Sequence, residues 1–285
     1  MESLKDIKRR MSAVGSTQKI TRAMKLVAAQ KLRQTQAVAN GGREYAEELH
    51  RVIERISKRL GERAPVMWRR SSSINCIDML VITSDRGLCG SFNESLIYEV
   101  VEGIHEHKQH NIDVKIFSIG YKGYEYFKSK GYDVERISNN MGTEVAVRTA
   151  VSSIMVRFLY GESSGSYVAF NRSIKSASRE ITFWNLLPLY SQGVADEKAI
   201  EYLFEPERDL ALDFFASEML MSTVRQAIYE SMASELSARV IAMSQATKNA
   251  DDMITHLKWV YNKVRQEVIT DELMDIVGGA NAIMK

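Results

Sequence analysis

The stretch LSARVIAMSQATKNADDMITHLKWVYNKVRQEV (236–268) repeats its apolar positions every seven residues without a break. One register contains Leu236, Met243, Ala250, Leu257 and Val264, and its companion contains Val240, Thr247, Ile254, Tyr261 and Val268. The steps between the registers alternate between four and three residues, which is the spacing of a left-handed coiled coil. We therefore expect a long coiled coil, a structure that transmits geometry and force.

Residues 3–60 have the composition and apolar rhythm of a second long helix. Apolar side chains recur at three- and four-residue steps, as at Leu4, Ile7, Met11 and Val14. Ala, Lys, Arg, Gln and Met, which are good helix formers, dominate the segment. The pair Gly41-Gly42 is its weakest point, but the heptad phase continues across the pair, which favours one helix over two.

Residues 70–190 alternate strand-like and helix-like segments. We expect strands at 74–83, 114–119 and 132–137, and helices at 93–108, 120–130 and 144–160. This alternation is typical of a parallel, Rossmann-like sheet. Two more strands, 167–170 and 181–187, joined by a polar, Ser-rich link, predict an antiparallel hairpin at one edge.

The expected fold class is therefore α/β, with a long antiparallel coiled coil of the N- and C-terminal helices and an inserted Rossmann-like α/β domain. The predicted domains are 1–60, 70–190 and 207–285. At about 1.5 Å per residue the first helix is roughly 80 Å long and the last roughly 110 Å, so the last overhangs by about 30 Å, from near residue 265. The seam of apolar heptad positions also ends there, because the next two heptad positions are Asp271 and Asp275.

Apolar side chains continue beyond the seam. They are Ile269, Leu273, Ile276, Val277, Ala280 and Ile283. A single helix with this much apolar surface is not expected to remain in water. We therefore expect the tip of the last helix to insert into a partner.

Charge is unevenly distributed along a chain whose net charge is only +2. No acidic residue occurs from Ile7 to Arg43, whereas four of the five charged residues among the last twenty are acidic. This asymmetry suggests two faces of a partner contact. Cys76 and Cys89, the only cysteines, are too few for a disulfide scaffold or a zinc finger, and we expect reduced thiols in a cytoplasmic protein.

Targeting and membrane signals are absent from the sequence. The N-terminus MESLKDIKRR has the character of neither a secretory signal nor a transit peptide. There is no apolar run of about 18 residues, so we expect no membrane span.

The segment SDRGLCGS (84–91) is the sharpest local motif, because it joins an expected strand to an expected helix. Glycines at such a turn can hold a phosphate against helix N–H groups. The dinucleotide motif GxGxxG and the phosphate-loop motif GxxxxGK[ST] are both absent, so a tight turn is the simpler interpretation. A catalytic thiol at Cys89 lacks a readable histidine or asparagine partner nearby.

Two other charged patterns admit a functional interpretation. The spacing of His105, His107 and His110 does not place all three on one face of a helix, so it does not predict a metal site. The basic run 8–33 is compatible with nucleic-acid binding, but it matches no DNA-reading motif and its charges alternate with apolar positions. On the residues alone, a nucleotide-binding α/β enzyme and a basic coiled-coil nucleic-acid binder both remain open.

Three longer motifs resemble one protein family, the γ subunits of F-type ATP synthases. IKRRMSAVGSTQKITRAMKLVAAQKLRQTQ (7–36) is similar to the N-terminal helix of that family, and SDRGLCGSFN (84–93) to its central loop. ASELSARVIAMSQATKNADDMI (233–254) and YNKVRQEVITDELMDIVGGANA (261–282) resemble its C-terminal helix. The resemblance covers both ends and the middle of the chain.

The resemblance implies a central rotor shaft that couples proton flow to ATP synthesis or hydrolysis. Its implied partners are the ring of α and β subunits, the ε subunit and the membrane ring of c subunits. It implies no catalytic residue, cofactor or metal on this chain, because ATP chemistry occurs on the β subunits.

The resemblance also assigns candidate partner-binding residues. Those implied to contact the α/β ring are Arg9, Arg10, Met24, Asp85, Arg86, Cys89, Arg265, Gln266, Thr270 and Ile276. The segment 196–206 and parts of 70–190 are implied to form the foot of the shaft. The link 191–206 is short and lacks the cysteines of the chloroplast regulatory insert. These features predict a bacterial enzyme on the cytoplasmic face of the plasma membrane.

Overall fold

The computed structural model describes the backbone of residues 3–60, 64–69, 74–137, 142–175, 178–189 and 207–283. Side chains are described for 3–57, 64–69, 74–137, 142–172, 180–189 and 207–277. The predicted foot segment 196–206 lies outside these residues. The chain divides into two compact units: a coil unit, Met1–Ala28 with Arg239–Lys285, and a sheet unit, Ala29–Ala238.

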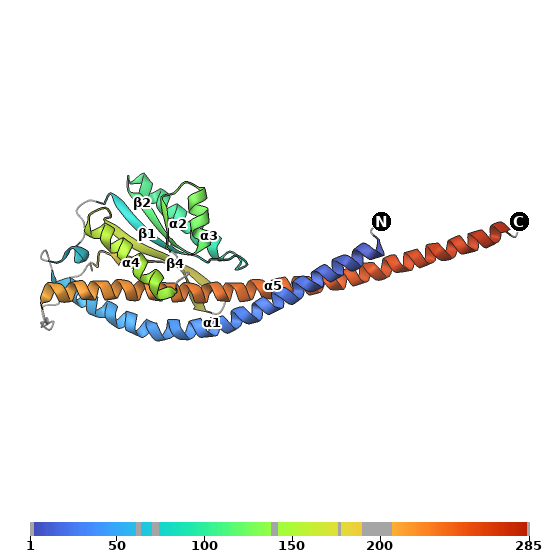
Figure 1. Cartoon of the computed structure of the whole chain (residues 1–285), viewed down its shortest axis with the longest axis horizontal. Coiled ribbons are helices and arrows are strands. Elements are labelled where there is room, and N and C mark those ends of the chain that lie inside the picture. The colour runs from blue at the N-terminus through green and yellow to red at the C-terminus, as the bar shows by residue number, and fades with distance from the viewer. Residues whose placement is uncertain are drawn as a thin grey trace. The chain divides into compact units, whose positions relative to one another are not determined.

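The sheet unit contains a five-stranded sheet with the order β3-β2-β1-β4-β5 (Figure 1). The strands are β1 (Cys76–Ile82), β2 (Asp113–Ile119), β3 (Val134–Ile137), β4 (Gly165–Lys175) and β5 (Ser178–Leu187). Strand β1 pairs in parallel with β2 and β4, and β3 pairs in parallel with β2. Strand β5 pairs antiparallel with β4. The expected parallel sheet with an antiparallel edge is confirmed.

Helices cover both faces of this sheet. On one face, α2 (Phe92–Gln109) and α3 (Tyr121–Ser129) pack with Met79, Val81 and Ile116 of the strands. On the other face, α4 (Thr143–Leu159) and the sheet-unit parts of the two long helices bury Leu80, Phe117, Phe170 and their neighbours. A short 3-10 helix, η2 (Val66–Trp68), contributes to the second core.

The β4–β5 hairpin is longer than the sequence predicts. The polar, Ser-rich segment expected to be a link is paired strand up to Lys175 and again from Ser178. Asn171 shows why a polar residue belongs in this strand. Its side chain is buried and donates a hydrogen bond to the carbonyl of Phe92 at 3.0 Å. The expected strand end at residue 170 was therefore wrong, because polarity was taken as a sign of a loop.

The first long helix, α1, runs from Leu4 to Leu60 without interruption. It continues through Gly41 and Gly42, as the heptad phase predicts. Gly42 faces the second long helix, and a Cβ built there would lie 3.0 Å from Gln226 Oε1. The glycine thus allows close helix contact and does not end the helix.

The second long helix, α5, runs from Arg208 to Ile283. In the sheet unit its buried residues include Leu212, Ala216, Leu220 and Val224. In the coil unit, Met243, Ala250 and Leu257 of the heptad are buried. The heptad pattern therefore marks the packed face of this helix.

Candidate functional site

The two helices of the coil unit run antiparallel and are joined by polar side chains. The contacts are Gln18 Nε2 to Asp251 Oδ1, Thr21 Oγ1 to Thr247 Oγ1 at 2.8 Å, and Lys25 Nζ to Ser244 Oγ at 3.1 Å. As the residue number rises by three or four on α1, the number of its partner on α5 falls by four or three, which is the register of an antiparallel pair. The same register, continued to Leu4 at the start of α1, reaches Arg265.

Helix α5 is exposed beyond Arg265, the position that the register places opposite the start of α1. Every side chain that the structure describes from Arg265 to Val277 is exposed. The apolar ones are 38–68% exposed, and they are Val268, Ile269, Leu273, Met274, Ile276 and Val277. The single-helix overhang therefore begins where the sequence predicts.

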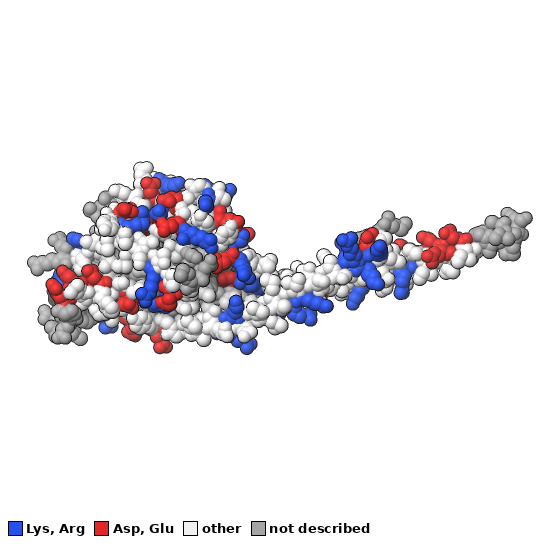
Figure 2. Space-filling view, viewed as in Figure 1, with Lys and Arg blue, Asp and Glu red and all other residues white. Residues whose placement is uncertain are grey.

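The overhang combines an apolar face with acidic charge. Ile269, Leu273, Ile276 and Val277 follow the spacing of one helical face. Acidic side chains gather on α5 near residues 271–275, and Lys and Arg gather on the part of the coil unit before them (Figure 2). Such an exposed apolar face marks an interaction surface.

Seven of the predicted site residues belong to the coil unit. Arg9 and Arg10 are exposed on α1, and Met24 is half-buried there. On the overhang, the predicted residues Arg265, Gln266, Thr270 and Ile276 are all exposed. The Thr270 hydroxyl donates to the carbonyl of Gln266 at 2.8 Å, so its hydrogen is used within the helix while its oxygen can still accept from a partner.

The other three predicted residues belong to the loop 84–91 of the sheet unit, which follows β1. Asn93 Nδ2 donates to Ser84 Oγ at 2.8 Å, and the Ser84 N–H donates to Asn93 Oδ1 at 2.9 Å. The Ser84 hydroxyl donates to the carbonyl of Arg86 at 2.7 Å. Asp85 Oδ1 accepts from the backbone N–H of Tyr121 at 3.1 Å. This reciprocal bonding fixes the conformation of the loop.

Cys89 attaches the loop to the interior of the sheet unit. Its side chain is 1% exposed and packs with Phe92 and with Ala238 of α5. Asn93 Nδ2 also lies 3.5 Å from Cys89 Sγ. Cys89 is therefore placed to support the loop, and the loop surface is formed by its neighbours.

Leu88 is a surface feature of this loop that the sequence interpretation did not single out. It is 61% exposed and has a φ of 67°, a conformation that is uncommon outside glycine. Asp85 and Arg86 are exposed beside it. The apolar residue between Gly87 and Gly90 was the available signal, because glycines often flank a projecting turn.

Two ion pairs of the sheet unit, Asp78–Arg157 and Glu144–Arg225, make structural contacts. Asp78, fully buried on β1, accepts hydrogen bonds from Arg157 Nε of α4 at 3.0 and 3.2 Å. Arg225 of α5 donates twice to Glu144 of α4, at 2.7 and 2.9 Å, and this hydrogen bonding lowers the pKa of Glu144. Among the described residues, no group of three or more His, Cys, Asp or Glu side chains could hold a metal ion.

None of the helices described has both the length and the hydropathy to span a bilayer.

Comparison with known proteins places the whole chain in one family. The ATP synthase family model matches residues 3–283. The gamma chain of ATP synthase from Mannheimia succiniciproducens is 36% identical, covering 99% of this chain and 100% of its own length. The gamma chain from Psychrobacter sp. strain PRwf-1 is 34% identical with the same coverage.

Solved structures share the fold. A chain of the Euglena gracilis mitochondrial ATP synthase, in a structure of OSCP, F1 and c-ring, matches with a TM-score of 0.70 and 20% identity, covering 98% of this chain and 94% of its own. A chain of the Tetrahymena thermophila mitochondrial ATP synthase, in a structure of the central stalk and c-ring, matches with a TM-score of 0.61 and 21% identity, covering 80% and 99%. With a family model over nearly its full length and relatives above 30% identity, the chain belongs to the gamma chains of ATP synthase.

Proposed function

We propose that this gamma chain is the central-stalk subunit of an F-type ATP synthase, transmitting torque between a membrane ring of c subunits and catalytic β subunits. Ion flow through the membrane ring would be coupled in this way to ATP synthesis or hydrolysis. The observation that carries the proposal is the exposed apolar overhang of α5 beyond Arg265. In this proposal the chain transmits torque, and ATP is synthesised or hydrolysed on the β subunits.

The overhang explains how a rotor can act on three equivalent sites. A single helix projecting beyond a helix pair has no threefold symmetry. Within a ring of three α and three β subunits it contacts the three catalytic sites differently. Differential contact is what shifts each site between conformations, and rotation exchanges those contacts in turn.

We assign the contacts with the ring to two surfaces. On the coil unit they are Arg9, Arg10 and Met24 of α1 together with Arg265, Gln266, Thr270 and Ile276 of α5. On the sheet unit they are Asp85, Arg86 and Leu88, with Cys89 supporting them from beneath. The long, exposed side chains of Arg265 and Gln266 offer hydrogen-bond donors to β-subunit loops.

The remaining assignments follow from family membership. The ε subunit and the c ring are proposed partners of the sheet unit and of the segment 196–206. As a peripheral subunit of a membrane complex, the chain would lie on the cytoplasmic face of a bacterial plasma membrane.

Co-assembly with rotation is the direct test. The chain is co-expressed with its α, β and ε subunits, and the purified complex is fixed by its ring while a bead is attached to the gamma chain. We expect ATP-driven rotation of the bead, and no heat when ATP is titrated into the isolated chain. A stable monomer that joins no complex, or a complex that hydrolyses ATP without turning the bead, would rule the proposal out.

A further inference from the structure

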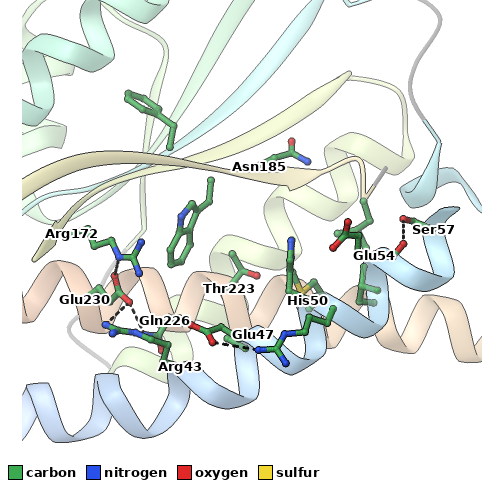
Figure 3. A pocket seen from close by; sticks show the side chains of 17 residues that line it. Arg43, Glu47, His50, Glu54, Ser57, Arg172, Asn185, Thr223, Gln226 and Glu230 are labelled. Carbon is green, nitrogen blue, oxygen red and sulfur yellow. Dashed lines mark hydrogen bonds and ion pairs between the residues drawn. The ribbon is translucent and has the colours of Figure 1, made fainter. Parts of the chain in front are cut away.

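The sheet unit contains a buried carboxylate shared by three elements. Glu230 of α5 is only 4% exposed. Arg43 Nη2 of α1 lies 3.1 Å from its Oε1, and Arg172 Nε of β4 lies 3.1 Å from its Oε2 (Figure 3). One side chain thus links both long helices to the sheet.

Gln226, one turn earlier on α5, extends this cluster. Its Nε2 donates to Glu230 Oε1 at 2.9 Å and to the backbone carbonyl of Ala39 on α1 at 3.0 Å. Gly42 permits the approach, because its missing Cβ leaves room for Gln226 Oε1. The contacts between α1 and α5 at this level are therefore directional and fixed in register.

Arg172 connects the cluster to the sheet core. Its guanidinium carbon lies 6.0 Å from the centre of the Trp184 ring on β5, and Trp184 meets Phe170 edge to face at 4.6 Å. Phe170 is fully buried in the core. A displacement of the hairpin relative to the helices would therefore pull Arg172 away from Glu230.

The cluster borders a cavity of about 800 Å³ between α1, β5 and α5. His50, Glu54, Asn185 and Thr223 line this cavity, as Figure 3 shows. The hairpin is therefore separated from the helices over part of its length. Apolar contact elsewhere opposes separation but has little directional preference. The hydrogen bond from Arg43 and the ion pair with Arg172, by contrast, hold the two carboxylate oxygens of Glu230 at defined points.

We propose that Glu230 is a positioning residue that locks the β4–β5 hairpin to α1 and α5 against sliding, so that torque applied to the α/β part of the chain reaches the helices. The proposal rests on the proposed rotor function. A buried salt bridge contributes little net stability compared with apolar packing. The three charged side chains are therefore better explained by the register that they fix between the hairpin and the helices than by stability.

The test measures torsional stiffness in the assembled complex. The ring is fixed, catalysis is arrested, and a bead is attached through Lys108→Cys on α2 in a Cys76→Ser background. Its angular variance equals the thermal energy divided by the stiffness. In Glu230→Gln we expect the variance to rise by roughly twofold, because the charge that pairs with Arg43 and Arg172 is lost.

A second attachment site separates the lock from the shaft. With the bead on Glu44→Cys of α1, which is exposed, the lock is bypassed, and Glu230→Gln should leave the variance unchanged. A triple variant Arg43→Met, Glu230→Met, Arg172→Met replaces the ions by apolar groups that can pack, so it should fold and still show the wider variance at Lys108→Cys.

Asp78→Asn is the matched control, because it removes a buried carboxylate paired with arginine inside the α/β part only. An unchanged variance in Glu230→Gln and in the triple variant would overturn the lock, as would an equal rise in Asp78→Asn. Failure of the unmodified chain to rotate would instead refute the rotor function, and the lock with it.

Discussion

Thr21 on α1 and Thr247 on α5 meet hydroxyl to hydroxyl at 2.8 Å, across 226 residues of sequence. Each hydroxyl has one hydrogen and a possible backbone acceptor in its own helix, the carbonyl of Gln18 for Thr21 and that of Met243 for Thr247. One hydroxyl therefore donates across the pair while the other donates to its own backbone carbonyl. Together with the neighbouring contacts Gln18–Asp251 and Lys25–Ser244, this pair fixes the register of the coil.

Replacing one of these threonines should cost more than replacing both. Thr21→Val is expected to destabilise the chain by about 1 kcal/mol, since Thr247 loses a partner, while the double Val variant should be close to the unmodified chain. Urea unfolding of the four chains gives the coupling energy. Additive losses would show that the two hydroxyls do not interact.

Ile276→Asp should weaken assembly with the α and β subunits by roughly tenfold or more, because it transfers a carboxylate from water into an apolar sleeve. Ile276→Leu is the control and should assemble normally. Complex formation and coupled ATPase activity are measured for both. Equal behaviour of the two variants would mean that the tip is not enclosed.

Leu88→Gly should separate stability from function. Glycine relieves the left-handed backbone at this position and is expected to stabilise the chain by up to about 1 kcal/mol. If Leu88 contacts a β subunit, ATPase activity of the complex should fall nevertheless. The control is Gly87→Ala, where a Cβ meets nothing within 4 Å; a comparable loss of activity there would implicate loop stiffness and not the leucine.

Gly120→Ala should be among the most destabilising single changes. With a φ of +95°, a Cβ there would lie 2.1 Å from the carbonyl oxygen of Thr83. We expect a loss of several kcal/mol in unfolding free energy. Gly131→Ala shares a positive φ but meets nothing within 4 Å, so it should cost only about 1–2 kcal/mol. Similar losses in both would place the cost in the backbone alone.

Glu144 makes stability depend on pH. Hydrogen bonding from Arg225 lowers its pKa from the ordinary value of 4.5. Its contribution is therefore complete above pH 4.5 and is lost as the pH falls through the lower folded-state pKa. The pair is largely exposed, so the contribution is below about 1 kcal/mol. Glu144→Gln should make the urea midpoint depend less steeply on pH between pH 5 and 3. An unchanged pH dependence of the midpoint would contradict the assignment.

The sequence was sufficient for the long-range architecture. The heptad run in 236–268 identified the packed face of α5, and its end identified the overhang, because apolar periodicity directly reports burial along a helix. The continuity of α1 through Gly41-Gly42 also followed from phase. The full length of the β4–β5 hairpin did not, because residues such as Asn171 satisfy their polarity inside the fold.

Tertiary clusters were beyond the reach of sequence reasoning. Arg43, Arg172 and Glu230 are single charges on three elements, and no spacing rule connects them. Leu88 was missed because its exposure depends on a backbone angle. The partner contacts of Arg265, Gln266 and Thr270 stay predictions, since their exposure permits contact without identifying what they touch.

The coil unit is built from the two ends of the chain, and this has a consequence for biosynthesis. Gln18 cannot form its contact with Asp251 until Asp251 has been synthesised, 233 residues later. At 5–20 residues per second, the delay is roughly ten seconds or more. Throughout that interval the apolar side of the nascent first helix has no partner from its own chain, so a ribosome-associated chaperone has both the time and the surface to bind it.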